Sequence, residues 1–364
     1  MNFDQGEPAT QVPATAISPL AWRQLWMVWA LSAMARTRAM NTSFCSKCRA
    51  ALLARLIEEF PNMKSHILKW KHGKTAPFLH AFDDNAPTQL DILIPEQQKR
   101  QMVGDFYIIP GGERFQEQQA EWEIAAQSPF VVLANHTFTH AGATSAAQLE
   151  PELARCSDAI RALTPAQKWP RILGFGRPGG VPWTISDEEN DRLLNQFHLA
   201  QRPRFRNPHK PEKSTAQTTT ELLAIVDEAL RDGEVGQIGF HGVGGDWLLT
   251  PLECFHALLD KLEAHREEIW FTDAASWHKY QTERDAAKLK ILQEDEQQIR
   301  LQLCCETDSI FYDLPLSVEI EVPQNWTKCV VRQGASEFGG VAQKGTLRLE
   351  MSPVPGEFVL TPAI

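Results

Sequence analysis

The feature that most constrains the fold of this chain is an alternation, from Trp70 onward, of short apolar runs with longer helical patterns. Each short run is apolar and bounded by turn residues, which predicts buried strands at 76–82, 104–110, 129–136, 170–176, 236–242 and 268–274. Helical patterns at 146–163, 214–233 and 250–267 lie between them. Alternating strands and helices predict an α/β fold with a parallel sheet, either open or closed as a barrel.

The N-terminal part of the chain has a different composition from the central α/β region. Residues 1–68 begin with a polar, acidic tail, and the apolar stretch 19–39 is interrupted by Arg23 and Gln24. That stretch suits either a secretion signal or anchor, or an amphipathic helix, although the tail before it lacks the basic residues of a signal. We treat 1–68 as an atypical and poorly ordered N-terminal segment, and membrane association stays open.

Beyond the barrel, a charged pattern at 283–298 predicts an exposed helix, after which alternating strand patterns replace helical ones. The predicted domains are therefore an α/β barrel over 69–298 and a small β domain over 299–364.

The charge balance excludes one class of partner. The chain carries 46 acidic and 36 basic side chains, for a net charge of −10, so no basic stripe is available to neutralise nucleic-acid phosphates. Seven irregularly spaced cysteines do not form the framework of a disulfide scaffold, and their odd number leaves the redox compartment open.

Two groups of polar residues follow predicted strands. His136 and His140 lie four residues apart after the run 129–136, and Asp83 and Asp84 follow the run 76–82. Adjacent carboxylates at a strand end are costly unless a cation compensates them. One aspartate and two histidines would give a divalent metal three protein ligands and leave positions open, as in catalytic sites. The second aspartate would then be free to act as a base on water.

Four motifs in this order resemble the polysaccharide deacetylase family, also called carbohydrate esterase family 4 or the NodB-like deacetylases. They are AFDDN from residue 81, NHTFTH from 135, FGRPGG from 175 and GFHGVGGDW from 239. The resemblance extends over about 70–283. It implies a distorted (β/α) barrel with the small β unit after it, and a site at the carboxyl ends of the strands.

The resemblance also implies roles for single residues. It makes Asp83 the catalytic base and His241 the general acid, with Arg177 orienting the base. The implied metal ligands are Asp84, His136 and His140. Zinc suits two histidines and one aspartate best, and cobalt, manganese or iron could substitute for it.

Three departures from the family pattern bear on the substrate pocket. The third motif has RPGG where the family commonly has Arg-Pro-Pro-Tyr, so an aromatic wall is either missing or supplied by Trp183. Gly239 replaces the hydrophobic residue that usually lines the acetate pocket. The aspartate motif that tunes the acid histidine is absent from 202–217, and Asp246 is the candidate replacement.

The expected activity is metal-dependent hydrolysis of an N- or O-acetyl group on a carbohydrate. A backbone N–H near Gly179 or Gly180 would stabilise the oxyanion, and Trp183 and Trp247 could stack on a sugar. Two alternatives stay open, a hydrolase of the same fold that acts on a non-sugar amide, and a weakly active carbohydrate-binding relative. The expected location is secreted or at the cell surface, and the sequence does not indicate the oligomeric state.

Overall fold

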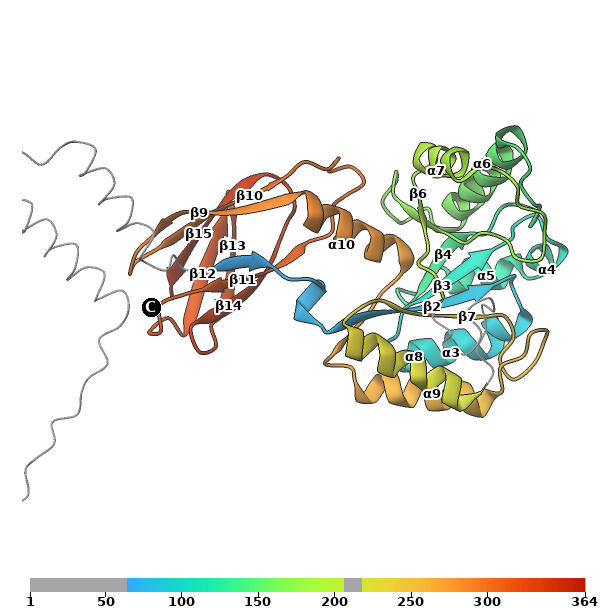
Figure 1. Cartoon of the computed structure of the whole chain (residues 1–364), viewed down its shortest axis with the longest axis horizontal. Helices are drawn as coiled ribbons and strands as arrows, with labels where there is room; N and C mark the ends of the chain where they lie inside the picture. Colours follow the sequence, from blue (N-terminus) through green and yellow to red (C-terminus); the bar gives the residue numbers. More distant parts are fainter. Residues whose placement is uncertain (1–63, 206–217, 364) are drawn as a thin grey trace, which may run out of the picture.

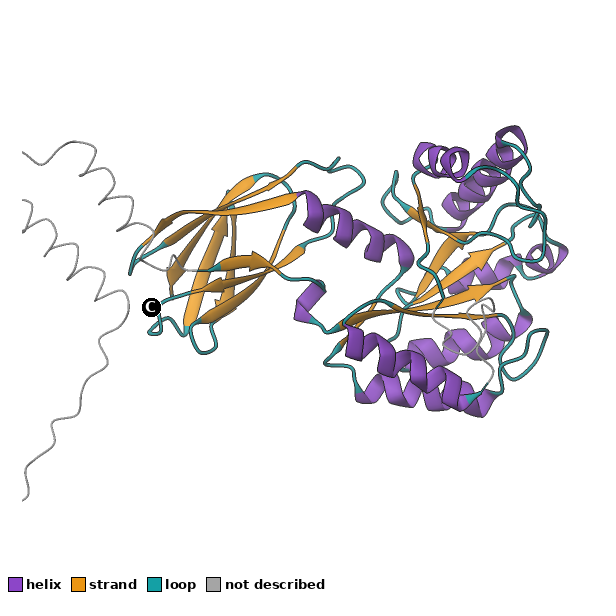
Figure 2. Cartoon of the chain, viewed as in Figure 1, coloured by secondary structure: helices purple, strands orange, loops and turns teal. Residues whose placement is uncertain are grey.

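The computed structural model describes residues 64–205 and 218–363, which form two lobes (Figure 1). An α/β lobe carries the motifs, and a lobe made almost entirely of strands lies beside it (Figure 2). The stretch 19–39 and most of the atypical N-terminal segment lie outside the described residues. Within the described residues, no helix is both long enough and apolar enough to span a membrane.

The α/β lobe is built on a seven-stranded sheet in which every pairing is parallel. Its path is β6–β5–β4–β3–β2–β7, and β8 pairs with the start of β2. The bounds are β2 Ala76–Asp83, β3 Gly104–Ile108, β4 Val131–Asn135, β5 Leu173–Phe175, β6 Leu199–Gln201, β7 Gly236–Phe240 and β8 Ile269–Phe271. The parallel sheet curls toward a barrel, but its two end strands, β6 and β7, do not pair in the described part of the chain. This open, curled sheet confirms the predicted distorted (β/α) barrel.

The two faces of the sheet carry side chains of different size. On the outer face, the Phe82 ring stacks on Phe106 and Phe240 from the two neighbouring strands, and all three belong to the core beneath the helices. On the inner face, Ala81 and Ala134 form a small cluster with Tyr107, and the two alanines leave room for polar groups. The three large rings of the outer core contrast with these two small residues inside.

Most helices of this lobe lie on the outer face of the sheet, whereas η1 and α10 lie between the two lobes (Figure 1). Their bounds are η1 Lys71–Gly73, η2 Gln89–Leu93, α3 Ile94–Lys99, α4 Glu113–Glu117, α5 Gln119–Ala125, α6 Ala146–Leu163, α7 Asp187–Gln196, α8 Thr219–Asp232, α9 Leu252–Ala264 and α10 Ala274–Ala286. Helix α8 begins with a capping box, in which Thr218 and Glu221 each bond the other's backbone N–H. Three predicted helices thus appear as α6, α8 and α9.

The second lobe is a β-sandwich. A three-stranded sheet, β1–β11–β14, faces a five-stranded sheet, β13–β12–β15–β10–β9. The bounds are β1 Ser65–Ile67, β9 Ala287–Glu294, β10 Ile299–Cys305, β11 Leu316–Glu321, β12 Lys328–Gln333, β13 Ser336–Val341, β14 Thr346–Met351 and β15 Gly356–Pro362. Alternate residues of both sheets fill one shared core.

The predicted exposed helix at 283–298 is wrong. Helix α10 ends at Ala286, and β9 follows as an antiparallel partner of β10. The reason lies in the sequence AKLKILQE, where Leu289 and Ile291 alternate with Lys288 and Lys290, which is the period of a strand. The β lobe therefore includes β9, upstream of residue 299, and it also takes β1 from the segment before residue 69.

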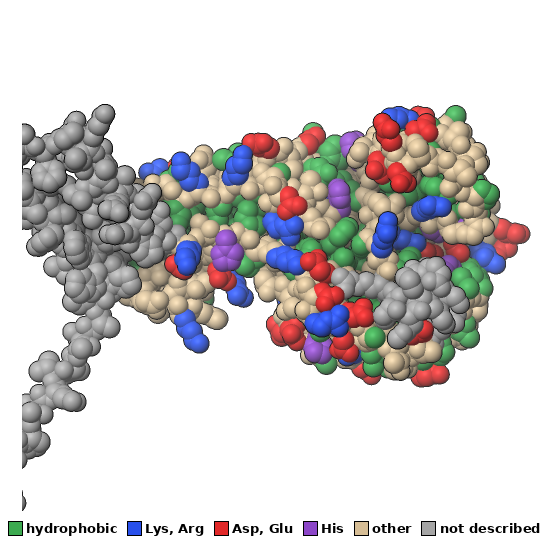
Figure 3. All heavy atoms as spheres, in the orientation of Figure 1, with side chains coloured by type: hydrophobic (Ala, Val, Ile, Leu, Met, Phe, Trp, Pro, Cys, Tyr) green, Lys and Arg blue, Asp and Glu red, His purple; other side chains and the backbone are tan. Residues whose placement is uncertain are grey.

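Side chains join the two lobes. The Trp70 Nε1–H donates to Gly233 O at 2.8 Å, and the Tyr280 hydroxyl donates to Leu68 O at 2.9 Å. Trp270 and Tyr280, from the end of the α/β lobe, belong to the same hydrophobic core as the sandwich strands. On the face drawn in Figure 3, acidic and basic side chains are interspersed over both lobes.

Candidate metal and catalytic site

The motif residues converge at the carboxyl ends of the parallel strands. Asp83 is the last residue of β2 and Asp84 follows it, while His136 follows β4 and His241 follows β7. In barrels of parallel strands this edge is where loops from several strands meet. The structure thus brings together residues that lie up to 158 positions apart in the chain, the difference between 241 and 83.

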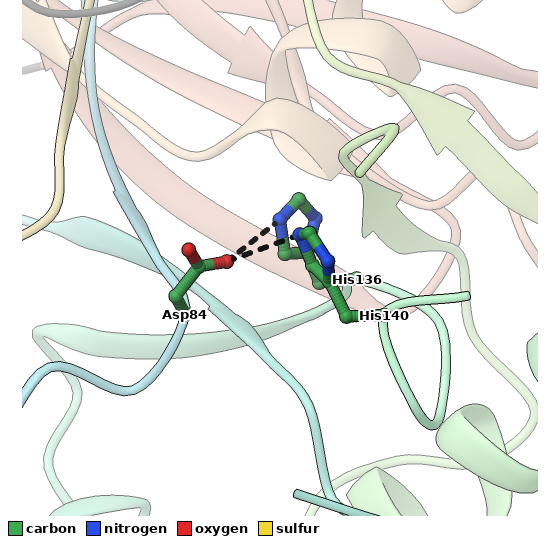
Figure 4. Close-up of side chains that lie close together, drawn as sticks. All are labelled: Asp84, His136 and His140. Atoms are coloured by element: carbon green, nitrogen blue, oxygen red, sulfur yellow. Dashed lines mark ion pairs between the residues drawn. The ribbon is translucent and has the colours of Figure 1, made fainter. Parts of the chain in front are cut away.

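Three of these side chains form a group that could hold a metal ion, namely Asp84, His136 and His140 (Figure 4). Asp84 Oδ1 lies 3.3 Å from His136 Nε2 and 3.4 Å from His140 Nε2. A tetrahedral ion with bonds of about 2.1 Å keeps its ligand atoms roughly 3.4 Å apart. The spacing of the two histidines from the aspartate therefore suits a zinc-sized ion.

The hydrogen bonds around His136 support this fit. Its Nδ1 lies 2.7 Å from the carbonyl oxygen of Gly176, which can only accept, so the proton is assigned to Nδ1. Nε2 of the neutral ring then presents a lone pair to the Asp84 carboxylate. Asp84 Oδ1 is buried without a hydrogen-bond partner among the described residues. Two facing acceptors require a cation or a proton between them. The bond from His136 Nδ1 to a backbone carbonyl is also typical of metal-binding histidines.

The backbone around these ligands is strained. Asp84, Thr137 and His140 have positive φ values of 71°, 64° and 59°, a region that residues other than glycine seldom adopt. Asn135 holds the turn after β4, since its Oδ1 accepts Thr137 N at 2.9 Å and its Nδ2 donates to Leu153 O at 2.9 Å. The asparagine of the NHTFTH motif thus fixes the loop that carries both histidines.

The structure corrects the predicted partner of Asp83. Arg202, just after β6, donates two hydrogen bonds to the Asp83 carboxylate, at 2.6 and 2.9 Å, and both side chains are buried. Arg177 is exposed instead, and its guanidinium lies over the Trp183 ring at 5.1 Å. The prediction that Arg177 orients Asp83 is therefore wrong, because the arginine comes from the next strand of the sheet.

Arg202 was not predicted from the sequence, because the stretch 202–217 was noted only for its lack of the family's aspartate motif. The position at a strand end was a signal, but β6 is only three residues long and was not predicted. The Arg202 guanidinium lies between two aromatic rings, 4.4 Å from the centroid of Tyr107 and 4.5 Å from that of Phe205. These rings hold the planar group in place for a bidentate bond.

The charges at the site keep Asp83 ionised. Burial by itself raises the pKa of the Asp83 carboxyl, but the Arg202 charge, helped by His136 and His241, outweighs it and holds the pKa below its usual range. Burial also raises the pKa of the Asp84 carboxyl, but the neighbouring His136 outweighs burial, so the pKa of Asp84 is lowered as well. The site therefore offers two carboxylates, one paired with an arginine and one facing histidines.

His241 lies beside the aspartates, with Nε2 3.5 Å from Asp84 Oδ2. Its Nδ1 is buried and has no hydrogen-bond partner among the described residues, so Asp246 does not tune it as predicted. Asp246 Oδ2 instead accepts the Thr88 N–H at 2.8 Å. Gln89 Nε2 donates to Asp83 O at 2.7 Å and contacts His241 O at 3.4 Å, which ties β2 to β7.

The remaining predicted residues lie on the loops of the same edge. Gly179 and Gly180 are exposed after β5, and a Cβ added to either would meet no atom within 4 Å. Trp183 forms an isolated bridge with Ala143, three residues beyond His140. The Trp247 carbonyl accepts the Gly242 N–H at 3.1 Å, next to His241. Both tryptophans are half-buried beside the site.

Comparison with known proteins returns few sequence matches. No family model matches the chain. A gellan lyase from a Bacillus species is 29% identical over 90 residues, which make up 25% of this chain and 4% of the length of that protein.

Solved structures are similar in fold. A mutant of a CE4 family pseudoenzyme with restored enzymatic activity has a TM-score of 0.39 and 16% identity, over 53% of this chain and 63% of that one. A family 4 carbohydrate esterase from Streptomyces lividans, in complex with acetate, has a TM-score of 0.40 and 15% identity, over 54% and 91%. Peptidoglycan deacetylase PdaC from Bacillus subtilis has a TM-score of 0.42 and 16% identity, over 58% and 94%.

By its sequence motifs, the chain resembles the polysaccharide deacetylases of carbohydrate esterase family 4.

Proposed function

We propose that the protein is a metal-dependent deacetylase that hydrolyses N- or O-acetyl groups on a carbohydrate. One observation carries the proposal: the Asp84 carboxylate faces Nε2 of both His136 and His140, while Asp83, next in the chain, is held apart by Arg202. Asp84 would thus serve as the metal ligand, while Asp83 would stay off the metal and could act as a base. A divalent ion there, with zinc the best match to the ligands, would polarise the acyl carbonyl and lower the pKa of water.

Asp83 would accept the proton of the attacking water. Its pKa lies below the usual range, so it is a carboxylate at every pH at which the fold is expected to work. The two bonds from Arg202 occupy the carboxylate and fix its plane, and a base held in place transfers protons without first having to reorient. Gln89, bonded to the Asp83 carbonyl, fixes the backbone from which the base projects.

His241 would donate a proton to the leaving nitrogen or oxygen. It projects from the end of β7, next to β2, so it approaches the reacting group from a different strand than Asp83 does. The N–H groups near Gly179 and Gly180 lie on the loop after β5 and would face the oxyanion. Proton acceptor, proton donor and oxyanion donors would thus come from three loops of one sheet edge.

A second candidate is hydrolysis of a non-sugar amide at the same site. Gly239 favours it, because this buried position on β7 lacks the hydrophobic side chain expected to line an acetate pocket. Export to the cell surface also remains part of the proposal, since acetylated polysaccharides are found there.

The test is acetate release from acetylated chitooligosaccharides and acetylated xylan, with metal-stripped protein and with protein reloaded with zinc or cobalt. We expect release only after reloading, and the preferred substrate would distinguish amide from ester. Reloaded protein that binds metal but releases no acetate from either substrate would contradict carbohydrate deacetylation and favour the second candidate.

A further inference from the structure

Three arginines around the site share an unusual arrangement. Each guanidinium lies over an aromatic ring, and none has a carboxylate within ion-pair distance among the described residues. The pairs and their distances are Arg177 over Trp183 at 5.1 Å, Arg114 over Trp247 at 4.0 Å and Arg155 over Phe138 at 3.8 Å. By contrast, Arg100, Arg231 and Arg300, which lie elsewhere, all form ion pairs with acidic residues.

The aromatic rings fix these arginines near the chemistry. Phe138 lies between the two histidines of the NHTFTH motif, and its carbonyl accepts the Gly111 N–H at 2.7 Å. Arg177 directly follows Gly176, whose carbonyl contacts His136 Nδ1. Arg177 lies on the loop after β5, Arg114 on α4 and Arg155 on α6, so the three cations come from different elements, and each lies over a ring of a motif loop.

The nearby acidic side chains form no ion pair with these arginines in the described part of the chain. Asp246 and Glu152 already accept backbone N–H groups, from Thr88 and Thr139, at 2.8 and 2.7 Å. Glu113 is exposed at the start of α4, and in the described part of the chain no ion pair joins it to Arg114. Arg114, Arg155 and Arg177 are all exposed, so their guanidinium N–H groups stay available to an anion.

We propose that the substrate is an acetylated polysaccharide that carries carboxylates, that is, an acetylated polyuronate. This rests on the deacetylase function proposed above and names its substrate class. A guanidinium over a ring uses its face for the ring and leaves its N–H edge free, and that edge matches a carboxylate in bidentate geometry. Arg177, Arg114 and Arg155 bind the carboxylates of sugar units on either side of the acetylated one.

The first test compares kcat/KM for acetate release from acetylated polygalacturonate and from acetylated xylooligosaccharides that lack uronic acid. We expect the ratio to favour the polyuronate and to fall as salt rises, because exposed charges are screened. Arg177→Gln should lower the ratio about tenfold through KM, the size of one charge-assisted pair. Arg332→Gln, which breaks an exposed ion pair with Glu337 on the β-sandwich, is the matched control and should not change the ratio.

A second measurement does not depend on turnover. Binding of polygalacturonate without acetyl groups to the Asp83→Asn variant should weaken in Arg177→Gln and at high salt. If no substrate is deacetylated but this binding persists, the deacetylase proposal fails and the recognition of polyuronates survives. Equal kcat/KM for both substrates, with no polygalacturonate binding, would overturn the inference while leaving the deacetylase function intact.

Discussion

Asp83 depends on a single buried partner. Arg202 is 8% exposed and Asp83 4%, so neither charge has much access to water once the other is removed. A buried ion pair contributes little net stability by itself, but loss of one member leaves the other uncompensated. Substitution of Arg202 can therefore distinguish the role of Asp83 as a base from the role of Arg202 in positioning it.

Arg202→Met should destabilise the fold by about 3–5 kcal/mol, because Asp83 would remain buried without a partner. It should also lower kcat about 100-fold or more, because without the Arg202 charge burial raises the pKa of Asp83, and a carboxyl that is already protonated cannot accept a proton from water. Arg202→Lys should recover part of the stability but less of kcat, because an ammonium cannot form the bidentate bond. Urea unfolding and acetate release measure the two effects.

The matched control is Arg192→Met, which removes an exposed arginine of α7 that bonds Gln196. Stability and kcat should stay within error. If Arg202→Met were as active as this control, the pair with Asp83 would have no role in the reaction.

At the scale of elements, two loops must lie close together for the site to form. A Cβ added to Gly142 would lie 2.2 Å from the Pro182 carbonyl oxygen, so the loop that carries His140 can approach the β5 loop only through a glycine. The Ala143–Trp183 bridge lies at the same contact. The packing of two backbones thus positions a metal ligand.

Gly142→Ala should separate these loops and weaken zinc binding about tenfold, an effect typical of altered support for a metal ligand. Competition with a chelating dye measures the affinity. Gly339→Ala on β13 is the control, since a Cβ there would come no closer than 4.0 Å to the Cys329 carbonyl. Equal affinities in the two variants would show that the loop contact does not position His140.

Periodicity and motif order predicted most elements, because buried parallel strands are short apolar runs and α6, α8 and α9 repeat apolar residues at helical spacing. β6 was missed because its sequence, LAQ, is not part of a longer apolar run, whereas β5 and β8, which are equally short, lie within such runs. β9 was missed because its lysines are typical of an exposed helix. The alternation of apolar and charged residues is what distinguishes this strand from a helix. Asp84, His136 and His140 were found from residue chemistry, whereas Arg202 was not, because its partner lies 119 residues away.

At the scale of the whole molecule, a buried carboxyl lies where the lobes meet. Glu283, on α10, is fully buried, and its Oε1 accepts the Leu314 N–H at 2.9 Å while Oε2 has no partner among the described residues. Burial raises the pKa of Glu283 to about 7 from its ordinary 4.5. The contact between the α/β lobe and the β-sandwich therefore favours a protonated acid.

The sign of the resulting pH dependence follows from this shift. Between pH 4.5 and about 7 the unfolded chain has lost the Glu283 proton and the folded chain has kept it. Stability should therefore fall as pH rises through this window, by roughly 3 kcal/mol at most for this group. Glu283→Gln should remove that part of the dependence and stabilise the protein at pH 8.

Urea unfolding at several pH values compares Glu283→Gln with Glu337→Gln, an exposed control on β13. Parallel pH profiles for wild type and both variants would mean that Glu283 keeps its ordinary pKa in the folded protein.

The measurement that tests the central claim most directly is zinc binding by calorimetry, together with acetate release, in wild type, Asp83→Asn and Asp84→Asn. The separation of roles between neighbouring aspartates predicts that Asp83→Asn binds zinc as wild type does but releases no acetate. Asp84→Asn should lose both. Acetate release that survives in Asp83→Asn, or zinc binding that survives unchanged in Asp84→Asn, would contradict the assignment of base and ligand.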